Sequence, residues 1–449
     1  MDAPPHPLGR ERELDLLVDA LARVRQQSAP QLVTLVGVPG IGKSRLVHEL
    51  FASVDAQPDL IYWRQGRCLP YGEGVAFWAL GEILKAHAGV LEGEDEDDAV
   101  VKLQAVVDEA VPASEEARWV AKELGPLLGL GDPVEPGTDR RTESFAAWRR
   151  FFEGLAELDP LVLVFEDLHW ADEGLLDFID HLVDWAGSVP ILVVATARPE
   201  LLTRRPGWGG GKPNAATISL SPLTEEETAK LVHGLLDRAV LPAELQSQLL
   251  ERAGGNPLYA EEFARIAVER GGLAAGNGDL PLPESVQGLI AARLDALEEL
   301  EKRLLQDAAV VGKVFWLGAV AAVGGDDRTP ALADSLHGLE RREFVRRERR
   351  SSIEGDTQYA FAHTLVRDVA YSQIPRADRA EKHQRAAVWI ESFGRPDEYA
   401  ELRAHHYVNA LATARAAGEV APSLEQAARL ALRDAGARAA SLNAFSAAA

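Results

Sequence analysis

The spacing of apolar and polar residues divides this chain into two kinds of pattern. Up to residue 220, short apolar runs of strand type alternate with stretches of helical period. The strand-type runs lie within segments 31–36, 60–68, 160–172, 189–200 and 218–232. The helical stretches cover 11–24, 75–90, 98–110 and 142–158. Apolar runs that alternate with helices predict a parallel sheet with helices on both of its faces.

Helical period dominates the chain after residue 220. Thr224 is followed three residues later by Glu227, a capping-box pattern that predicts a helix start. Residues 276–283 have the glycine and proline content of a linker. From residue 376 onward the chain is alanine-rich and helical, similar to the opening of a stack of helix pairs, and such stacks need about three repeats to be stable.

The segment between these two helical parts has a mixed pattern. Helices predicted at 286–310 and 330–342 precede residues 343–363, which predict two strands around a polar turn. This order is typical of a winged helix. The apolar run 308–325 carries Lys313 near its centre, so we interpret it as buried helix and turn and not as a membrane span.

Composition and charge restrict the class of protein. The chain has 449 residues, 47% of them hydrophobic and 26% charged, as in globular proteins of about three domains. Its net charge of −23 disfavours broad binding to nucleic acid or to anionic membranes. Its one cysteine, Cys68, excludes an internal disulfide and a cysteine-rich zinc site. The first residues lack the apolar core of a signal peptide, so we expect a cytoplasmic protein.

Residues 37–44, GVPGIGKS, carry the most specific chemical pattern. The spacing Gly37-x-x-x-x-Gly42-Lys43-Ser44 between a strand and a helix is that of a phosphate-binding loop. Its glycines, Gly40 included, let backbone N–H groups converge on a polyphosphate, and the following helix favours an anion at its start. Lys43 would reach the β and γ phosphates, and Ser44, followed by Arg45, would hold Mg²⁺. The alternative is a glycine-rich turn without a ligand.

Two further strand ends supply candidate residues. Glu166 and Asp167 end the third strand-type run, where a Walker B pair would hold the metal and orient the attacking water. By their order, we assign Glu166 to the metal and Asp167 to the base, with both near Mg²⁺. The alternative is a pair of acids that caps a helix. Arg198 ends the next strand and could contact the γ phosphate, or it could be a surface arginine before Pro199.

Residues 254–263, GGNPLYAEEF, place helix-breaking residues inside a helical region. Pro257 could pack against the adenine ring. The alternative is a simple helix start.

The order of these motifs resembles the STAND-type ATPase module of the AAA superfamily, which occurs in bacterial multidomain regulators with a cyclase or a LuxR-type DNA-binding domain. The motifs are PLGRERELDLL, GVPGIGKSRLVHEL, GRCLPYGEGVAFWAL, LVLVFEDLHWADE, TARPE, GNPLYAEEF, ARLDAL and FAHTLVRDVAYSQIP, and they span nearly the whole chain. The resemblance implies a P-loop NTPase core at 1–215, a helical lid at 216–285, a winged helix at 286–375 and a helical region at 376–449 that begins TPR-like repeats.

The resemblance also implies roles for residues outside the phosphate loop. Leu8, Gly9 and Arg10 would line the adenine site, with Pro257 as the proline of the lid motif, although Gly-Asn-Pro departs from the family's GxP-like pattern. His363 in FAHTLV resembles a winged-helix histidine that touches the β phosphate of ADP. A histidine packed in the core is the alternative for His363.

These features lead us to expect a signalling switch that binds ATP or ADP with Mg²⁺ and hydrolyses ATP slowly. Its partners would be a cyclase or DNA-binding effector domain in cis or in trans, and a protein or small-molecule stimulus at the C-terminal repeats. A nucleotide-dependent oligomer would fit the family, whereas a membrane partner would not. Three alternatives stay open: a DNA-binding regulator that uses the arginine-rich segment 341–350, a ring-forming AAA+ remodelling ATPase, and a small-molecule kinase. The chain shows neither a pore loop nor an arginine finger for a remodeller, nor a second-substrate domain for a kinase.

Overall fold

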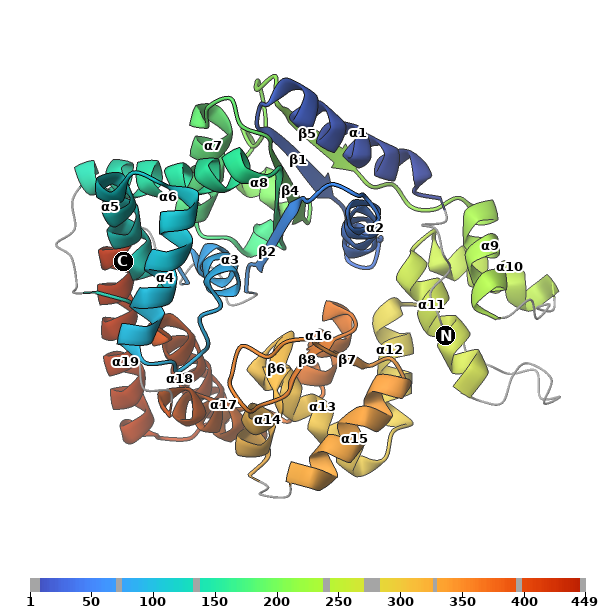
Figure 1. The fold of residues 1–449 in the computed structure, drawn as a ribbon. Helices are drawn as coiled ribbons and strands as arrows, with labels where there is room; N and C mark the ends of the chain where they lie inside the picture. The colour runs from blue at the N-terminus through green and yellow to red at the C-terminus, as the bar shows by residue number, and fades with distance from the viewer. Residues whose placement is uncertain are drawn as a thin grey trace.

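The fold is a parallel α/β core followed by helical parts that curve around one side of it (Figure 1). The computed structural model describes residues 9–69, 75–131, 138–236, 243–269, 283–325, 329–392 and 398–444. Leu8 and all of the predicted linker 276–283 except Pro283 lie outside these residues.

Five parallel strands form the core sheet in the order β2-β3-β4-β1-β5. The strands are β1 (Gln31–Val36), β2 (Tyr62–Arg67), β3 (Leu161–Glu166), β4 (Ile191–Ala197) and β5 (Ala215–Ser219). Every residue of β3 and β4 is buried, as the unbroken apolar runs predict for central strands. The predicted parallel sheet is therefore confirmed.

Alternate residues of the strands enter two different apolar clusters, because successive side chains of a strand point to opposite faces. Val162 and Val164 pack with α1 (Glu11–Gln27) and α2 (Lys43–Asp55). Leu163 and Phe165 belong to the cluster on the other face, which also holds Trp148 of α6 and Phe178 of α7. The elements on that face are α3 (Trp78–Ala88), α4 (Glu96–Ala110), α5 (Ser114–Leu124), η1 (Gly125–Leu128), α6 (Thr138–Leu158) and α7 (Glu173–Trp185). Both faces of the sheet are thus covered by helices.

Three helices follow β5 and form most of a small apolar cluster. They are α9 (Glu225–Leu235), α10 (Ala243–Ala253) and α11 (Pro257–Glu269). The predicted capping box is present: the N–H of Glu227 donates to Thr224 Oγ1 at 3.2 Å, and the N–H of Thr224 donates to Glu227 Oε2 at 2.7 Å. We call these three helices the lid helices.

The next part, residues 283–372, contains helices and a three-stranded antiparallel sheet of order β6-β8-β7. We call it the second unit. Its elements are α12 (Val286–Asp295), α13 (Glu299–Val311), β6 (Val314–Trp316), α14 (Leu317–Gly324), α15 (Thr329–Arg341), β7 (Val345–Arg347), β8 (Gln358–Phe361) and α16 (Thr364–Ser372). The two strands predicted within 343–363 are β7 and β8. The single helix predicted over 286–310 is wrong, because Glu298 caps a new helix after α12 ends.

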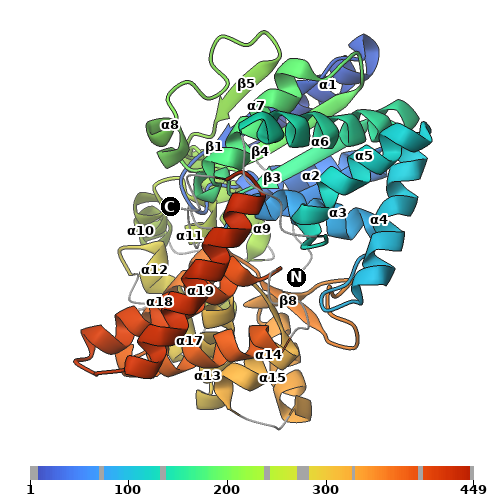
Figure 2. The same ribbon diagram turned by 90° about the vertical axis from the view of Figure 1, so that its left-hand side faces the viewer.

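Three helices end the described chain: α17 (Arg376–Glu391), α18 (Ala400–Ala416) and α19 (Pro422–Ser441). Buried alanines such as Ala404, Ala410 and Ala428 form most of their shared cluster, so the helices can approach closely. The end of α19 returns to the core, where Ala439 and Leu442 join the cluster under the sheet. Figures 1 and 2 both show α19 running up to the helices of the core.

The contact between the core and the C-terminal helices is polar at its centre. Lys85 of α3 forms ion pairs with Glu92, at 2.7 Å, and with the buried Glu398. Arg438 Nε of α19 lies 3.0 Å from Glu401 Oε2 of α18. Gly129 has a φ of 70°, and a Cβ there would lie 3.0 Å from the Cβ of Glu398. Glycine thus lets the backbone after η1 approach the C-terminal helices closely.

We expect this contact to make stability depend on pH through Glu401. Burial raises the pKa of Glu401 from 4.5 to about 7, although Arg438 acts in the opposite direction. Between these pH values the folded chain keeps a proton that the unfolded chain has lost, so stability falls as the pH rises from 4.5 to 7. Glu401→Gln, which mimics the protonated acid, should therefore raise the melting temperature by about 2 °C at pH 8 and have little effect at pH 5.

Glu425→Gln is the matched control for Glu401→Gln in thermal unfolding, because Glu425 lies on α19 in an exposed pair with Arg415. Its effect should be the same at both pH values. An equal effect of Glu401→Gln at pH 5 and pH 8 would contradict the raised pKa.

No helix within the described residues is both long enough and apolar enough to cross a membrane.

Candidate functional site

The glycine-rich loop that is predicted to bind phosphate joins the end of β1 to the start of α2. Gly40 and Gly42 have φ values of 81° and 107°, which side chains disfavour, and α2 begins immediately afterwards at Lys43. A Cβ on Gly40 would lie 2.8 Å from Asn256 Oδ1, so only glycine fits this contact with the lid helices. The loop therefore has the backbone that the motif predicts, ending at a helix N-terminus that favours an anion.

Lys43 is buried, and its ammonium points back into the loop. Its Nζ donates to the carbonyls of Gly37, at 2.6 Å, and Val38, at 3.1 Å. Burial lowers the pKa of Lys43 to about 8; Asp167 raises it and Arg198 lowers it further. Lys43, Asp167 after β3 and Arg198 after β4 are therefore close enough to interact electrostatically. All three lie at the carboxyl edge of the parallel sheet, where open α/β folds bind ligands.

Glu166 and Asp167 lie at the end of β3, but their surroundings differ. Arg67, opposite Glu166 on the neighbouring strand β2, donates from Nε to Glu166 Oε2 at 2.7 Å. Burial would raise the pKa of Glu166, but Arg67 and Lys313 outweigh it and lower the pKa to about 2. Asp167 adopts a left-handed φ of 59°, and its N–H donates to Thr196 Oγ1 at 3.0 Å. Asp167 is thus the less enclosed of the two carboxylates.

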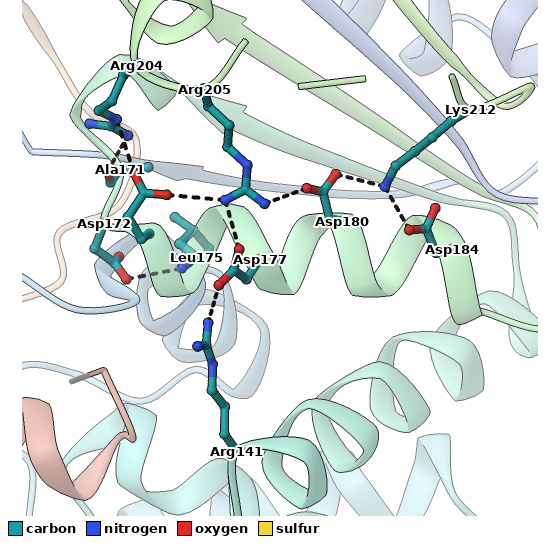
Figure 3. Close-up of polar contacts among 11 residues, drawn as sticks. Arg141, Ala171, Asp172, Leu175, Asp177, Asp180, Asp184, Arg204, Arg205 and Lys212 are labelled. Carbon is teal, nitrogen blue, oxygen red and sulfur yellow. Dashed lines mark hydrogen bonds and ion pairs between the residues drawn. The ribbon is translucent and has the colours of Figure 1, made fainter. Parts of the chain in front are cut away.

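The turn after these acids is held by arginines and by a helix cap (Figure 3). Arg204 of α8 (Glu200–Arg204) donates to the carbonyl of Ala171 at 2.7 Å, after the short helix η2 (Leu168–Trp170). Asp172 accepts from the N–H of Leu175 at 3.0 Å and so caps α7. The same figure shows Arg205 and Lys212 paired with the acids Asp177, Asp180 and Asp184 along α7. The contacts of Arg204 and Asp172 hold the turn that follows Asp167.

The lid helices contact the glycine-rich loop directly. The side-chain amide of Asn256 donates to the carbonyl of Pro39 at 3.1 Å, and the N–H of Leu258 donates to Gly40 O at 3.3 Å. Pro257 is the first residue of α11 and lies beside this contact. Arg10 donates to Ser221 O at 2.5 Å and Ile41 O at 3.3 Å, which braces the loop from the N-terminal side.

The second unit reaches the same place from the opposite side. His363 Nε2 lies 3.5 Å from Glu261 Oε2 of α11. Lys313 Nζ lies 3.8 Å from Asp167 Oδ2. Burial lowers the pKa of Lys313, and the nearby Arg67 lowers it further.

A buried ion-pair network joins the lid helices to the second unit. Arg293 Nη1 of α12 donates to Glu262 Oε2 of α11 at 2.6 Å, and both side chains are 1% exposed. Arg265 of α11 contacts Glu262 at 2.6 Å and Glu343 at 2.7 Å. Removing one partner of such a pair leaves a buried charge without compensation, so the two parts are strongly coupled.

The core, the lid helices and the second unit together line one cavity of about 870 Å³. Eight lysine and arginine side chains and five carboxylates line it, in a chain whose net charge is −23. The predicted site residues among its lining are Arg10, Gly40, Gly42, Lys43, Ser44, Arg45, Glu166, Asp167, Arg198, Pro257 and His363. Gly9 and Gly37 are not part of the lining; a Cβ on Gly9 would meet Glu227 at 2.8 Å. The excess of positive charge suits a polyphosphate ligand.

The donors at the loop suit Mg²⁺ held jointly with phosphates. Ser44, Glu166 and Asp167 offer one hydroxyl and two carboxylates, the oxygen ligands that Mg²⁺ prefers. Among the described residues, no group of three or more His, Cys, Asp or Glu side chains could hold a metal alone. Such a partial set fits a cation whose other ligands are phosphate oxygens and water.

Comparison with known protein families matches residues 6–194 to the AAA ATPase domain. This segment contains the loop, Lys43 and both acids. We call residues 6–194, which match this family model, the ATPase domain.

The fold of the chain is similar to that of a solved STAND protein. A Signal Transduction ATPase with Numerous Domains (STAND) protein with a tetratricopeptide repeat sensor, from Pyrococcus horikoshii, matches 96% of this chain at a TM-score of 0.52 and 13% identity. An uncharacterised protein of Rhizobium meliloti is 27% identical over 391 residues, or 82% of this chain. The chain spans 51% of the first protein's length and 36% of the second's.

Sequence reasoning missed four cations that line the cavity: Arg67, Arg265, Lys313 and Arg346. The signal for Arg67 was available, because it ends a strand next to Glu166. Lys313 stood out only as a charge within an apolar run, and nothing local links it to Asp167. Within the arginine-rich segment 341–350, Arg342 pairs with Glu301 and Arg346 with Glu348, so at least these two are engaged within the chain.

Proposed function

We propose that this chain is a nucleotide-controlled signalling switch that binds ATP and ADP with Mg²⁺, hydrolyses ATP slowly and controls an effector domain. One observation carries the proposal: three consecutive parts of the chain line a single cavity. Lys43 and Asp167 come from the ATPase domain, Pro257 comes from the lid helices, and Lys313 and His363 come from the second unit.

A switch requires that the nucleotide interact differently with two arrangements of the chain. Phosphate binding and hydrolysis need residues of the ATPase domain alone. Contacts from the lid helices and the second unit would add nucleotide interactions that exist only when the parts are together. The buried pair Glu262–Arg293 supports a joint movement of the lid helices and the second unit. Separating the two parts would break this pair and leave buried charges without their partners.

Each predicted residue has a proposed role. Lys43 would neutralise the β and γ phosphates, Ser44 and Glu166 would hold Mg²⁺, and Arg198 would contact the γ phosphate. The bound metal would supply charge compensation for the phosphates. Asp167, which also lies near the metal, would orient the attacking water and accept its proton. The ion pair of Arg67 with Glu166 Oε2 supports Asp167 and not Glu166 as the base.

The remaining predicted residues would surround the base and the far end of the phosphates. Arg10 and Pro257 would border the adenine, with Gly9 behind them, and His363 would face the β phosphate from the second unit. Arg45, the third residue of α2, also lines the cavity.

We propose the four domains 1–215, 216–285, 286–375 and 376–449 as the moving parts, with the 286–375 part a winged helix. The apolar clusters of the lid helices, the second unit and α17–α19 support this division, although β5 pairs with β1 in the core sheet and Leu289 of α12 joins the lid cluster. The effector, a cyclase or a DNA-binding domain, would act in cis or in trans, and a stimulus would bind the C-terminal helices. Direct DNA binding by this chain is disfavoured by its charge.

The purified chain should retain ADP through gel filtration and hydrolyse ATP far more slowly than the roughly 10 s⁻¹ of typical enzymes. His363→Ala should release ADP faster, because it removes a contact from the second unit. His337→Ala is the matched control, since His337 lies exposed on α15 beside Glu340. Anion-exchange analysis of denatured protein and stopped-flow release of a fluorescent ADP would measure both. A nucleotide-free preparation with fast steady-state hydrolysis would favour a working ATPase over a switch.

A further inference from the structure

Lys313 is a cation that the second unit brings to the acids of the ATPase domain. It follows Gly312, whose φ of 154° and ψ of −167° favour glycine, at the end of α13. The N–H of Phe361 in β8 donates to Lys313 O at 2.8 Å. The backbone that carries Lys313 is therefore fixed at both α13 and the small sheet.

The side chain of Lys313 is 13% exposed and forms an ion pair of 3.8 Å with Asp167 Oδ2. Glu166 is already paired with Arg67 inside the ATPase domain. Both acids line the cavity, but the ion pair of Lys313 is with Asp167. This contact forms only while the second unit lies against the ATPase domain.

A lysine and Mg²⁺ at the same carboxylate repel each other. The repulsion between two like charges grows as their distance falls, and a divalent ion doubles it relative to a monovalent one. Since the backbone of Lys313 belongs to the second unit, its ammonium can move away from Mg²⁺ only if the side chain adopts another rotamer or the second unit moves. Occupancy of Asp167 by the lysine therefore opposes its use by the metal.

We propose that Lys313 competes with Mg²⁺ for the carboxylate of Asp167, so that metal-bound nucleotide favours separation of the second unit from the ATPase domain. This inference rests on the proposed function and names its regulation. In the absence of metal, the lysine would stabilise the closed arrangement. With Mg²⁺ and a γ phosphate present, that stabilisation would be lost.

A Mg²⁺ titration of the binding of a fluorescent, non-hydrolysable ATP analogue tests the competition. For Lys313→Met, the Mg²⁺ concentration at half-maximal binding should fall at least about fivefold, the lower end of typical coupling between sites. Lys313→Arg keeps the charge and should behave like the wild type. Lys302→Met is the matched control, because Lys302 lies on α13 and pairs with Asp295 away from the cavity.

An unchanged Mg²⁺ midpoint in folded Lys313→Met, or a higher one, would overturn the inference; a higher midpoint would instead indicate that Lys313 contacts phosphate.

Hydrogen exchange on the wild type gives a test that does not depend on the variant's folding. Amides of β6 and β8 should exchange faster with the analogue and Mg²⁺ than with the analogue in EDTA, and equal rates would also overturn the inference. If the wild type binds ADP and turns over slowly while these tests fail, the proposed function stands without the competition. A wild type that binds no nucleotide would overturn both.

Discussion

Asp167→Asn should lower the rate of ATP hydrolysis about 10²- to 10⁴-fold, the usual contribution of a positioned general base, while nucleotide binding persists. Asparagine has nearly the same shape as aspartate and can occupy the left-handed backbone at this position, whose φ is 59°. It cannot accept the proton of the attacking water. Phosphate release in a single turnover at saturating ATP would measure the loss, and equilibrium titration would show that binding remains.

Two further variants make this test specific. Asp184→Asn is the matched control, because Asp184 of α7 pairs with Lys212 and lies outside the cavity lining. Glu166→Gln should weaken the dependence on Mg²⁺ and spare more of the turnover. If Glu166→Gln abolishes hydrolysis with metal affinity intact while Asp167→Asn does not, the two acids have the reverse roles.

Lys43→Ala should weaken ATP and ADP binding roughly 10- to 100-fold, since a charged contact to phosphate contributes about 1.5–3 kcal/mol. The ammonium of Lys43 lies inside the loop, held by the carbonyls of Gly37 and Val38, so no neighbouring side chain can replace it there. Titration with a fluorescent ATP analogue would measure the change.

Lys102→Ala provides the control for Lys43→Ala. It removes a lysine that pairs with Glu94 on the helical side of the core, outside the cavity lining. Binding equal to the wild type in Lys43→Ala would exclude the loop as the nucleotide site.

The parts of the site that sequence reasoning found are those set by local structure. Gly40, Gly42, Lys43 and Ser44 follow one another in a loop between a strand and a helix, so their geometry depends on a few consecutive residues. The acids at the end of β3 could be found because the carboxyl ends of parallel strands meet at one edge. The same logic, applied to β2, would also have found Arg67.

The parts that sequence reasoning missed depend on contacts between distant segments. The pairing of Lys313 with Asp167 and of Arg293 with Glu262 requires the second unit to fold back onto the core and the lid helices. No periodicity or spacing encodes that arrangement. The break between α12 and α13 was missed for a local reason, because the apolar period continues across Glu298 while the capping contact with Glu301 restarts the helix.

The return of α19 to the core has a kinetic consequence. The second unit is bounded on one side by the cavity and on the other by helices whose end, at Ala439 and Leu442, is packed under the core sheet. The polypeptide is therefore fastened at two separate places, and swinging the second unit away would require both to yield in the same event. The activation barriers of the two fastenings would then add, so a ligand on the C-terminal helices that loosened one of them would speed the opening that metal-bound nucleotide favours.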